Sequence, residues 1–308
     1  MDKHSVLSST ALFCHARLVL ARLIGAAVIA MLALTGCDWF KPQPPDIKFV
    51  PPTGQGYRAK VDFAELEYRY PLSPEDLKKI TPENLATLNQ EQIDQIYARL
   101  TAGPIPDGPF DGQVLFPRGS SGKLRVAEIA GGLTGMALQL KGLKLEHVGE
   151  ILWKGKMFFP QERVLRNRIE DLGVLKEVGL VEGEPKKIKV DGKETWLLFP
   201  AKLYCGQSLL DARRESIIID YFFTDEIPGY QEKPDYLAGR RGLRIRDEIR
   251  MVRPGFYLGR AYADRVFLLT FTLYNKKIAE RDGPAFLKTG QTKEDCWTGT
   301  QQRTMAAK

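Results

Sequence analysis

The sequence is poor in the residues that most often carry out catalysis or hold metal ions. It contains 3 histidines among 308 residues, and of these only His147 lies beyond residue 37. The 4 cysteines are widely separated, and no cluster of His, Cys or carboxylate residues has the spacing of a zinc or calcium site. A glycine-rich phosphate loop and a dinucleotide fingerprint are also missing. The sequence therefore predicts neither a metal centre nor a cofactor.

Long apolar runs are scarce as well, since the longest is too short to cross a membrane. It extends from Leu23 to Leu34 and follows Arg17 and Arg22. As a helix it would span roughly 18 Å, which is less than the roughly 30 Å of a bilayer core. Basic residues before a short apolar run are typical of a cleaved signal peptide. The alternatives are an ordinary secretory signal with a chance cysteine, or a short anchor that is not cleaved.

Four residues that close this run, Leu34-Thr35-Gly36-Cys37, resemble the lipobox of bacterial lipoproteins. The resemblance implies cleavage after Gly36, diacylglycerol on the Cys37 thiol and acylation of the new amino terminus. On this basis we expect a protein of the bacterial cell envelope that is held to a membrane by lipid, faces the periplasm and does not bind nucleic acid. Asp38 resembles the inner-membrane retention signal of enteric lipoproteins, but that rule varies between bacteria, so the choice of membrane stays open.

Processing at the lipobox would leave two cysteines in the body of the protein, Cys205 and Cys296. In an oxidising periplasm they can form a disulfide, which would stabilise the fold by roughly 4 kcal/mol. The alternative is two separately buried thiols. Sequence alone leaves both possibilities open, because pairing requires the two Cα atoms to come within bridging distance.

Composition divides the chain into five segments. They are a signal peptide, a lipidated cysteine with a proline-rich tether, a short helical region, a main α+β domain and a polar C-terminal tail. The helical region has start signals at Ser73, Thr81 and Asn89. Within the main domain, apolar residues three and four apart predict an amphipathic helix over residues 123–150. The five segments cover residues 1–36, 37–56, 57–109, 110–275 and 276–308.

From residue 151 onward, apolar residues recur with a period of two, which predicts β-strands. Asp191-Gly192, Pro254-Gly255 and Asp264-Arg265 separate them as tight turns. Short connections require antiparallel neighbours, and a continuous meander favours a closed or nearly closed barrel. The predicted fold class is α+β, with a helical N-terminal region followed by an antiparallel, barrel-like sheet. The predicted strands cover residues 114–116, 151–159, 163–170, 187–190, 195–205, 215–223, 244–252, 256–263 and 266–275.

Two stretches of the chain resemble lipocalin-like domains, which place a W-x-G strand early and a long hairpin late. They are residues 152–158 (LWKGKMF) and residues 250–260 (RMVRPGFYLGR), and the resemblance extends over roughly residues 110–275. It implies a cavity for an apolar ligand but transfers no set of functional residues. The helix predicted over residues 123–150 departs from the pattern, because true lipocalins lack a helix at that point.

Three charged residues interrupt strand faces that are otherwise apolar, namely Asp220, Asp247 and Arg260. Because a buried charge must be paired, we expect these three side chains to converge. They would form either a polar clamp at the base of an apolar pocket, where Arg260 grips a carboxylate or phosphate head group, or an internal ion-pair network that closes the barrel. The residues expected to line the cavity are Trp153, Phe158, Ile219, Tyr221, Leu258 and Phe271.

A polar loop that contains Ser208, Asp211, Arg213 and Arg214 invites a hydrolase hypothesis. A serine nucleophile needs a base, however, and the loop lacks the G-x-S-x-G elbow, so no catalytic residue is predicted. The predicted function is an envelope lipoprotein that binds an apolar or amphiphilic ligand, such as a lipid, in its barrel. The alternatives are a non-enzymatic envelope scaffold that binds a partner protein and, less favoured, a hydrolase.

Overall fold

The computed structural model describes residues 42–51, 61–115, 117, 153–177, 179, 181 and 183–299. The predicted signal peptide, Cys37, His147 and the predicted helix over residues 123–150 lie outside these ranges. From Pro44 onward the described residues belong to one compact unit. Among the helices that the structure describes, none is long and apolar enough to cross a membrane.

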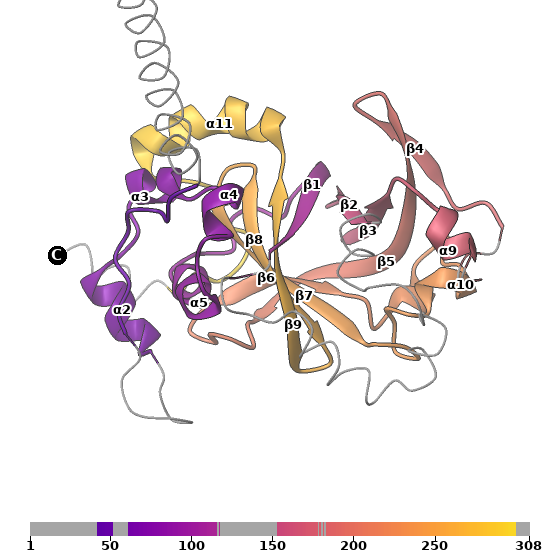
Figure 1. Ribbon diagram of the computed structural model, residues 1–308, viewed down its shortest axis with the longest axis horizontal. Helices are drawn as coiled ribbons and strands as arrows, with labels where there is room; N and C mark the ends of the chain where they lie inside the picture. The colour runs from indigo at the N-terminus through magenta and orange to yellow at the C-terminus, as the bar shows by residue number, and fades with distance from the viewer. Residues whose placement is uncertain are drawn as a thin grey trace, which may run out of the picture. The chain divides into compact units, whose positions relative to one another are not determined.

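Eight antiparallel strands close into a barrel at the centre of the described structure (Figure 1). Around the barrel the order is β3, β2, β1, β9, β8, β7, β6 and β5, and pairing of β3 with β5 closes the circle. Strand β4 pairs with β5 and extends the sheet beyond the barrel. The predicted antiparallel barrel is therefore confirmed. The strands are β1 (Gly108–Leu115), β2 (Trp153–Phe159), β3 (Val164–Ile169), β4 (Lys187–Val190), β5 (Lys193–Gln207), β6 (Glu215–Asp220), β7 (Ile245–Arg253), β8 (Phe256–Ala263) and β9 (Val266–Tyr274).

Strand β1 is the main difference from the predicted strand pattern. The sequence predicts a strand over residues 114–116, whereas the strand of the structure already begins at Gly108. Position 112 of this strand requires a glycine, because a Cβ atom there would lie 2.4 Å from the Trp153 ring. The glycine thus lets an aromatic side chain of β2 pack directly on the backbone of β1.

Helices cover the outer face of one part of the barrel, and Figure 1 shows α2 to α5 gathered on that side. Three of them begin with reciprocal capping boxes at Ser73, Thr81 and Asn89, as their start signals predict. Their apolar side chains form a second core against Val252, Phe256 and Leu258 on the outside of β7 and β8. The helices of the structure are α2 (Phe63–Arg69), α3 (Pro74–Lys79), α4 (Pro82–Leu85), α5 (Gln90–Ala98), α9 (Gly173–Glu177), η2 (Thr224–Glu226), α10 (Glu232–Asp235) and α11 (Lys276–Thr289).

Described residues of the predicted tether and of the predicted C-terminal tail pack against the body of the protein. In the predicted tether, Ile47 and Phe49 pack against the helical core, and Val50 exchanges two backbone hydrogen bonds with the Gln95 side chain. In the predicted tail, residues 276–289 form α11, which buries Phe286. Burial of these apolar side chains attaches the described residues 47–50 and 276–289 to the body.

Arg250 of β7 is completely buried where the helices meet the outside of the barrel. Its guanidinium donates hydrogen bonds to the Ser216 hydroxyl at 2.9 Å, to the Tyr97 carbonyl at 3.2 Å and to the Asp211 carboxylate at 3.2 Å. A buried cation is tolerated only when its donors are satisfied in this way. Arg250 therefore joins β6, α5 and the loop after β5 at one point.

The loop that invited the hydrolase hypothesis completes this network. Arg213 and Arg214 both bind the Glu67 carboxylate of α2, and Arg213 also binds Asp211 at 2.7 Å. The Ser208 hydroxyl accepts hydrogen bonds from the backbone N–H groups of residues 210 and 211. The loop thus fastens the helices to the barrel, and its serine stabilises a local turn.

We predict that Asp211→Ala lowers the free energy of unfolding by about 3–5 kcal/mol, because Arg250 is left buried without a carboxylate. Burial raises the pKa of Asp211, but the hydrogen bond from Arg213 and the charges of Arg250 and Arg213 lower it more, so the net direction is down. The stabilisation is therefore complete above the unfolded value of 3.8 and is lost as pH falls through the folded pKa.

Urea denaturation near neutral pH and at about pH 3 tests this prediction. The difference between wild type and variant should shrink at the lower pH, while Asp107→Ala, at an exposed carboxylate, should have little effect at either. An equal destabilisation by Asp211→Ala at both pH values would contradict the ion-pair account.

Candidate functional site

The barrel interior receives most of the residues predicted to line a cavity. Trp153, Phe158, Ile219, Tyr221 and Phe271 all belong to its core, where they pack against one another. The rings of Trp153 and Phe271 meet edge to face, with centroids 5.6 Å apart. The Phe271 ring also lies so close to β8 that a Cβ atom on residue 259 would approach it to 2.3 Å. These contacts pack the rings closely against one another and against β8.

Asp247 does point into the barrel, as predicted, and its partner is a lysine that the sequence analysis does not single out. The Nζ atom of Lys156 on β2 lies 2.9 Å from Oδ2 of Asp247, 2.6 Å from the Tyr221 hydroxyl and 3.0 Å from Oδ1 of Asn167. Trp153 donates its indole N–H to the same Asn167 oxygen at 2.8 Å. We refer to Trp153, Lys156, Asn167, Tyr221 and Asp247 as the Lys156 cluster.

The Lys156 cluster is buried and closely surrounded by aromatic rings. Lys156 is 2 % exposed, and its Nζ lies 5.2–5.4 Å from the ring centroids of Trp153, Tyr221 and Phe271. Burial lowers the pKa of Lys156, while the charge and hydrogen bond of Asp247 act in the opposite direction. Burial raises the pKa of Tyr221, and the nearby Asp247 charge raises it further. The three donors of the ammonium already have acceptors, so as an ion pair the cluster offers none to a ligand.

Asp220 and Arg260 do not join Asp247, and this part of the prediction is wrong. Arg260 binds Asp94 of α5 and the Tyr262 hydroxyl on the outside of the barrel. Asp220 accepts a hydrogen bond from the Tyr204 hydroxyl at 2.6 Å.

The register of the sheet explains the separation. Asp247 lies opposite residue 261 of β8, so Arg260, one residue earlier, points to the other face. Asp220 stands opposite Arg246, one residue before Asp247 on β7. Leu258 shares the outer face with Arg260 and packs in the helical core, so it does not line the interior.

A disulfide joins Cys205 on β5 to Cys296 near the C-terminus, with Cα atoms 5.4 Å apart. Further hydrogen bonds hold the same C-terminal segment. The Glu294 carboxylate accepts hydrogen bonds from the Thr101 hydroxyl and from the backbone N–H of residue 103, and the Asp295 carboxylate accepts one from the backbone N–H of residue 105. Glu215 lies with the two sulfur atoms in a group of possible metal ligands, but the sulfurs are bonded to each other. Within the described ranges we therefore assign no metal site to this group.

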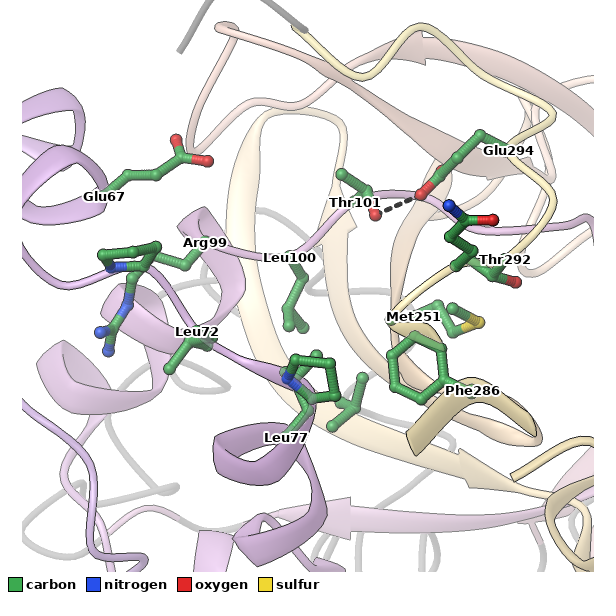
Figure 2. Close-up of a pocket in the computed structure, with 15 residues that line it drawn as sticks. Glu67, Leu72, Leu77, Arg99, Leu100, Thr101, Met251, Phe286, Thr292 and Glu294 are labelled. Atoms are coloured by element: carbon green, nitrogen blue, oxygen red, sulfur yellow. Dashed lines mark hydrogen bonds between the residues drawn. The ribbon is translucent and has the colours of Figure 1, made fainter. Parts of the chain in front are cut away.

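A pocket of about 580 Å³ lies outside the barrel, between the helices, the end of β7 and this C-terminal segment. Figure 2 shows Thr101, Thr292 and Glu294 on one side of it, with Leu100, Met251 and Phe286 near its centre. Its volume falls in the range of about 300–1,000 Å³ typical of small-molecule sites. The residues that line it are Glu67, Pro71, Leu72, Pro74, Leu77, Arg99, Leu100, Thr101, Met251, Val252, Phe286, Gly290, Gln291, Thr292 and Glu294. We refer to it as the outer pocket.

Arg99, which lines the outer pocket, has an unused donor. The side chain is 5 % exposed; Nε donates to the Gln95 carbonyl at 3.1 Å and Nη1 to the Tyr70 carbonyl at 2.9 Å, whereas Nη2 is buried without a hydrogen-bond partner. Burial lowers the pKa of Arg99 to about 10, against the raising effect of Asp76 and Glu67, so the group stays charged at neutral pH. A buried donor of a charged group without a partner is costly.

The sequence does not identify Lys156 and Arg99 as site residues. A weak indication exists for Lys156, because it lies two residues before Phe158 and therefore on the apolar face of its strand. The sequence gives no indication that Arg99 is buried, since an arginine at the end of an amphipathic helix is usually exposed. Its burial follows from the packing of the segment around Tyr70 against α5.

No family model matches the sequence, and no curated protein matches it. Among solved structures, one described as "Crystal structure of protein from Thermomonospora curvata" is similar, with 16 % sequence identity and a TM-score of 0.30. The match covers 62 % of this chain and 89 % of that chain. A TM-score at this level carries no conclusion about fold or function.

We predict that the double substitution Cys205→Ser and Cys296→Ser loosens one wall of the outer pocket, because the segment that bears Thr292 and Glu294 loses its covalent attachment. The free energy of unfolding should fall by about 4 kcal/mol in the chain-entropy model. Hydrogen exchange should become faster in residues 290–297, and wild type treated with a reductant serves as the control. Unchanged exchange in that segment would show that its other contacts hold the wall alone.

Proposed function

We propose that the protein is a lipid-anchored component of the bacterial cell envelope that binds an amphiphile with an anionic group, and that the outer pocket is the binding site. The observation that supports this most is the outer pocket itself, in which Arg99 is the lining cation and lies beside apolar side chains. The charge of Arg99 would attract a carboxylate or phosphate group, while Leu72, Leu77 and Phe286 would receive the apolar chain.

The two carboxylates that line the outer pocket do not oppose an anionic ligand strongly, because both are already engaged. Glu67 is neutralised by Arg213 and Arg214. Glu294 accepts hydrogen bonds from Thr101 and from the backbone N–H of residue 103. Arg99 is therefore the lining cation that an anionic group would meet.

This proposal moves the ligand from the inside of the barrel to its outside. The interior side chains that the structure describes pack against one another, and the donors of Lys156 are used within the cluster. The hydrolase hypothesis loses its nucleophile, since Ser208 is 5 % exposed and its hydroxyl caps a turn.

The lipid anchor rests on the resemblance of residues 34–37 to a lipobox, and the body adds a geometric argument. Ile47 packs against the helical core, and nine residues lie between Cys37 and Ile47. Such a segment spans at most about 35 Å. A lipidated Cys37 would thus keep the outer pocket within reach of a membrane, which is the richest source of amphiphiles.

We predict that Arg99→Met weakens binding of dodecanoate about tenfold or more and leaves binding of dodecanol unchanged, because only the anionic ligand gains a hydrogen bond from a charged donor. Titration calorimetry with both probes measures the two affinities. Arg69→Met removes an exposed arginine that pairs with Glu65 and serves as the matched control. Equal loss for both ligands would point to a folding defect, and no loss for dodecanoate would reject Arg99 as the anion site.

We predict that Cys37→Ala releases the protein from the membrane fraction, because the thiol that would carry diacylglycerol is removed. Metabolic labelling with an alkyne fatty acid and fractionation of the cells measure the change. Cys14→Ala is the matched control and should keep both the label and the membrane association. A Cys37→Ala protein that still carries label would contradict the lipobox interpretation.

A further inference from the structure

Two members of the Lys156 cluster stand directly opposite each other on neighbouring strands. In the pairing of β2 with β3, Lys156 is the register partner of Asn167, and the two residues are 2 % and 6 % exposed. The Nζ atom lies 3.0 Å from the side-chain oxygen of the carboxamide. A lysine amine is a nucleophile once it is neutral, and a carboxamide carbon is an electrophile, so the barrel holds two reactive groups in contact and away from water.

We propose that Lys156 and Asn167 become joined by an isopeptide bond, formed within the folded barrel by the other members of the cluster. A bond forms between Nζ of Lys156 and Cγ of Asn167, and the bond from Cγ to Nδ2 breaks. Nδ2 departs as ammonia. No oxidant, metal or other co-reactant takes part in the step.

Asp247 is placed to act as the base. Its Oδ2 lies 2.9 Å from Nζ, and it is 4 % exposed. In a dry interior an ammonium and a carboxylate are both poorly solvated, so transfer of one proton from Lys156 to Asp247 leaves two neutral groups. The direction of the Lys156 pKa, which burial lowers, agrees with a readily formed neutral amine.

Trp153 is placed to stabilise the negative charge that develops during attack, and Tyr221 is placed to relay a proton to the leaving nitrogen. The indole N–H of Trp153 donates to Oδ1 of Asn167 at 2.8 Å, the oxygen on which negative charge develops when the amine attacks. The Tyr221 hydroxyl lies 3.0 Å from Nδ2 of Asn167 and 3.3 Å from Oδ2 of Asp247, so it can relay a proton to the leaving nitrogen.

The protons balance without an outside donor. Lys156 gives up two protons on going from an ammonium to an amide N–H. One passes to Nδ2, which leaves as neutral ammonia, and the other stays on Asp247. The product contains no charge at the cluster, which favours it in an interior where charges are costly.

Peptide mapping of the purified wild-type protein tests the proposal directly. Trypsin cannot cleave after an acylated lysine, so the expected product is a branched pair made of residues 155–163 (GKMFFPQER) and residues 167–168 (NR). Its mass should be the sum of the two peptides less one ammonia. Complete cleavage after Lys156, with the linear peptide of residues 157–163 as the sole product, would overturn the proposal.

Two variants test the assigned roles. Trp153→Phe keeps a ring and removes the indole donor, so the branched peptide should form more slowly in freshly made protein, by about tenfold or more. Asp247→Asn should slow its formation by about a hundredfold or more. Lys154→Arg, next to the cluster in sequence, is the matched control and should leave the yield of the bond unchanged. Circular dichroism selects preparations that are folded, and normal formation of the bond in folded Asp247→Asn would overturn the role of the base.

Discussion

Burial of strands β6, β7 and β8 on both faces is the constraint on which the rest of the structure depends. Their inner faces form the barrel core, and their outer faces are covered by α5 and the loop after β5. A charged residue on either face is therefore removed from water and must find a partner. Inside the barrel Asp247 pairs with Lys156. On the outside Arg250 pairs with Asp211, and Arg260 pairs with Asp94.

The same constraint separates the two parts of the molecule for which we propose functions, namely the Lys156 cluster and the outer pocket. Aromatic rings surround the Lys156 cluster in the interior, and the polar groups of the cluster bind one another. The outer pocket forms where the helical layer ends, between α3, the end of β7 and the segment held by the disulfide. Arg99 is the cation among the residues that line this pocket, which is why we propose that binding occurs outside the barrel.

Much of the barrel is predictable from sequence, but the faces of its strands are not. The period of two finds β8 over residues 256–263 and β4 over residues 187–190 without error. Alternation tells which residues share a face, yet it does not tell which face is inside when both are buried. Asp247 points inward, as predicted. Arg260 and Leu258 are also expected to point inward, but they lie on the outer face of β8, which is buried as well. Sequence alone does not decide whether the disulfide forms, because the distance between residues 205 and 296 depends on the closed barrel and on where the chain runs after α11.

A crystal structure of the protein with dodecanoate bound tests the central claim most directly, namely that the ligand site lies outside the barrel. The account predicts the carboxylate beside the Arg99 side chain and the alkyl chain along Leu72, Leu77 and Phe286. An alkyl chain inside the barrel, next to Lys156 and Phe271, would contradict it.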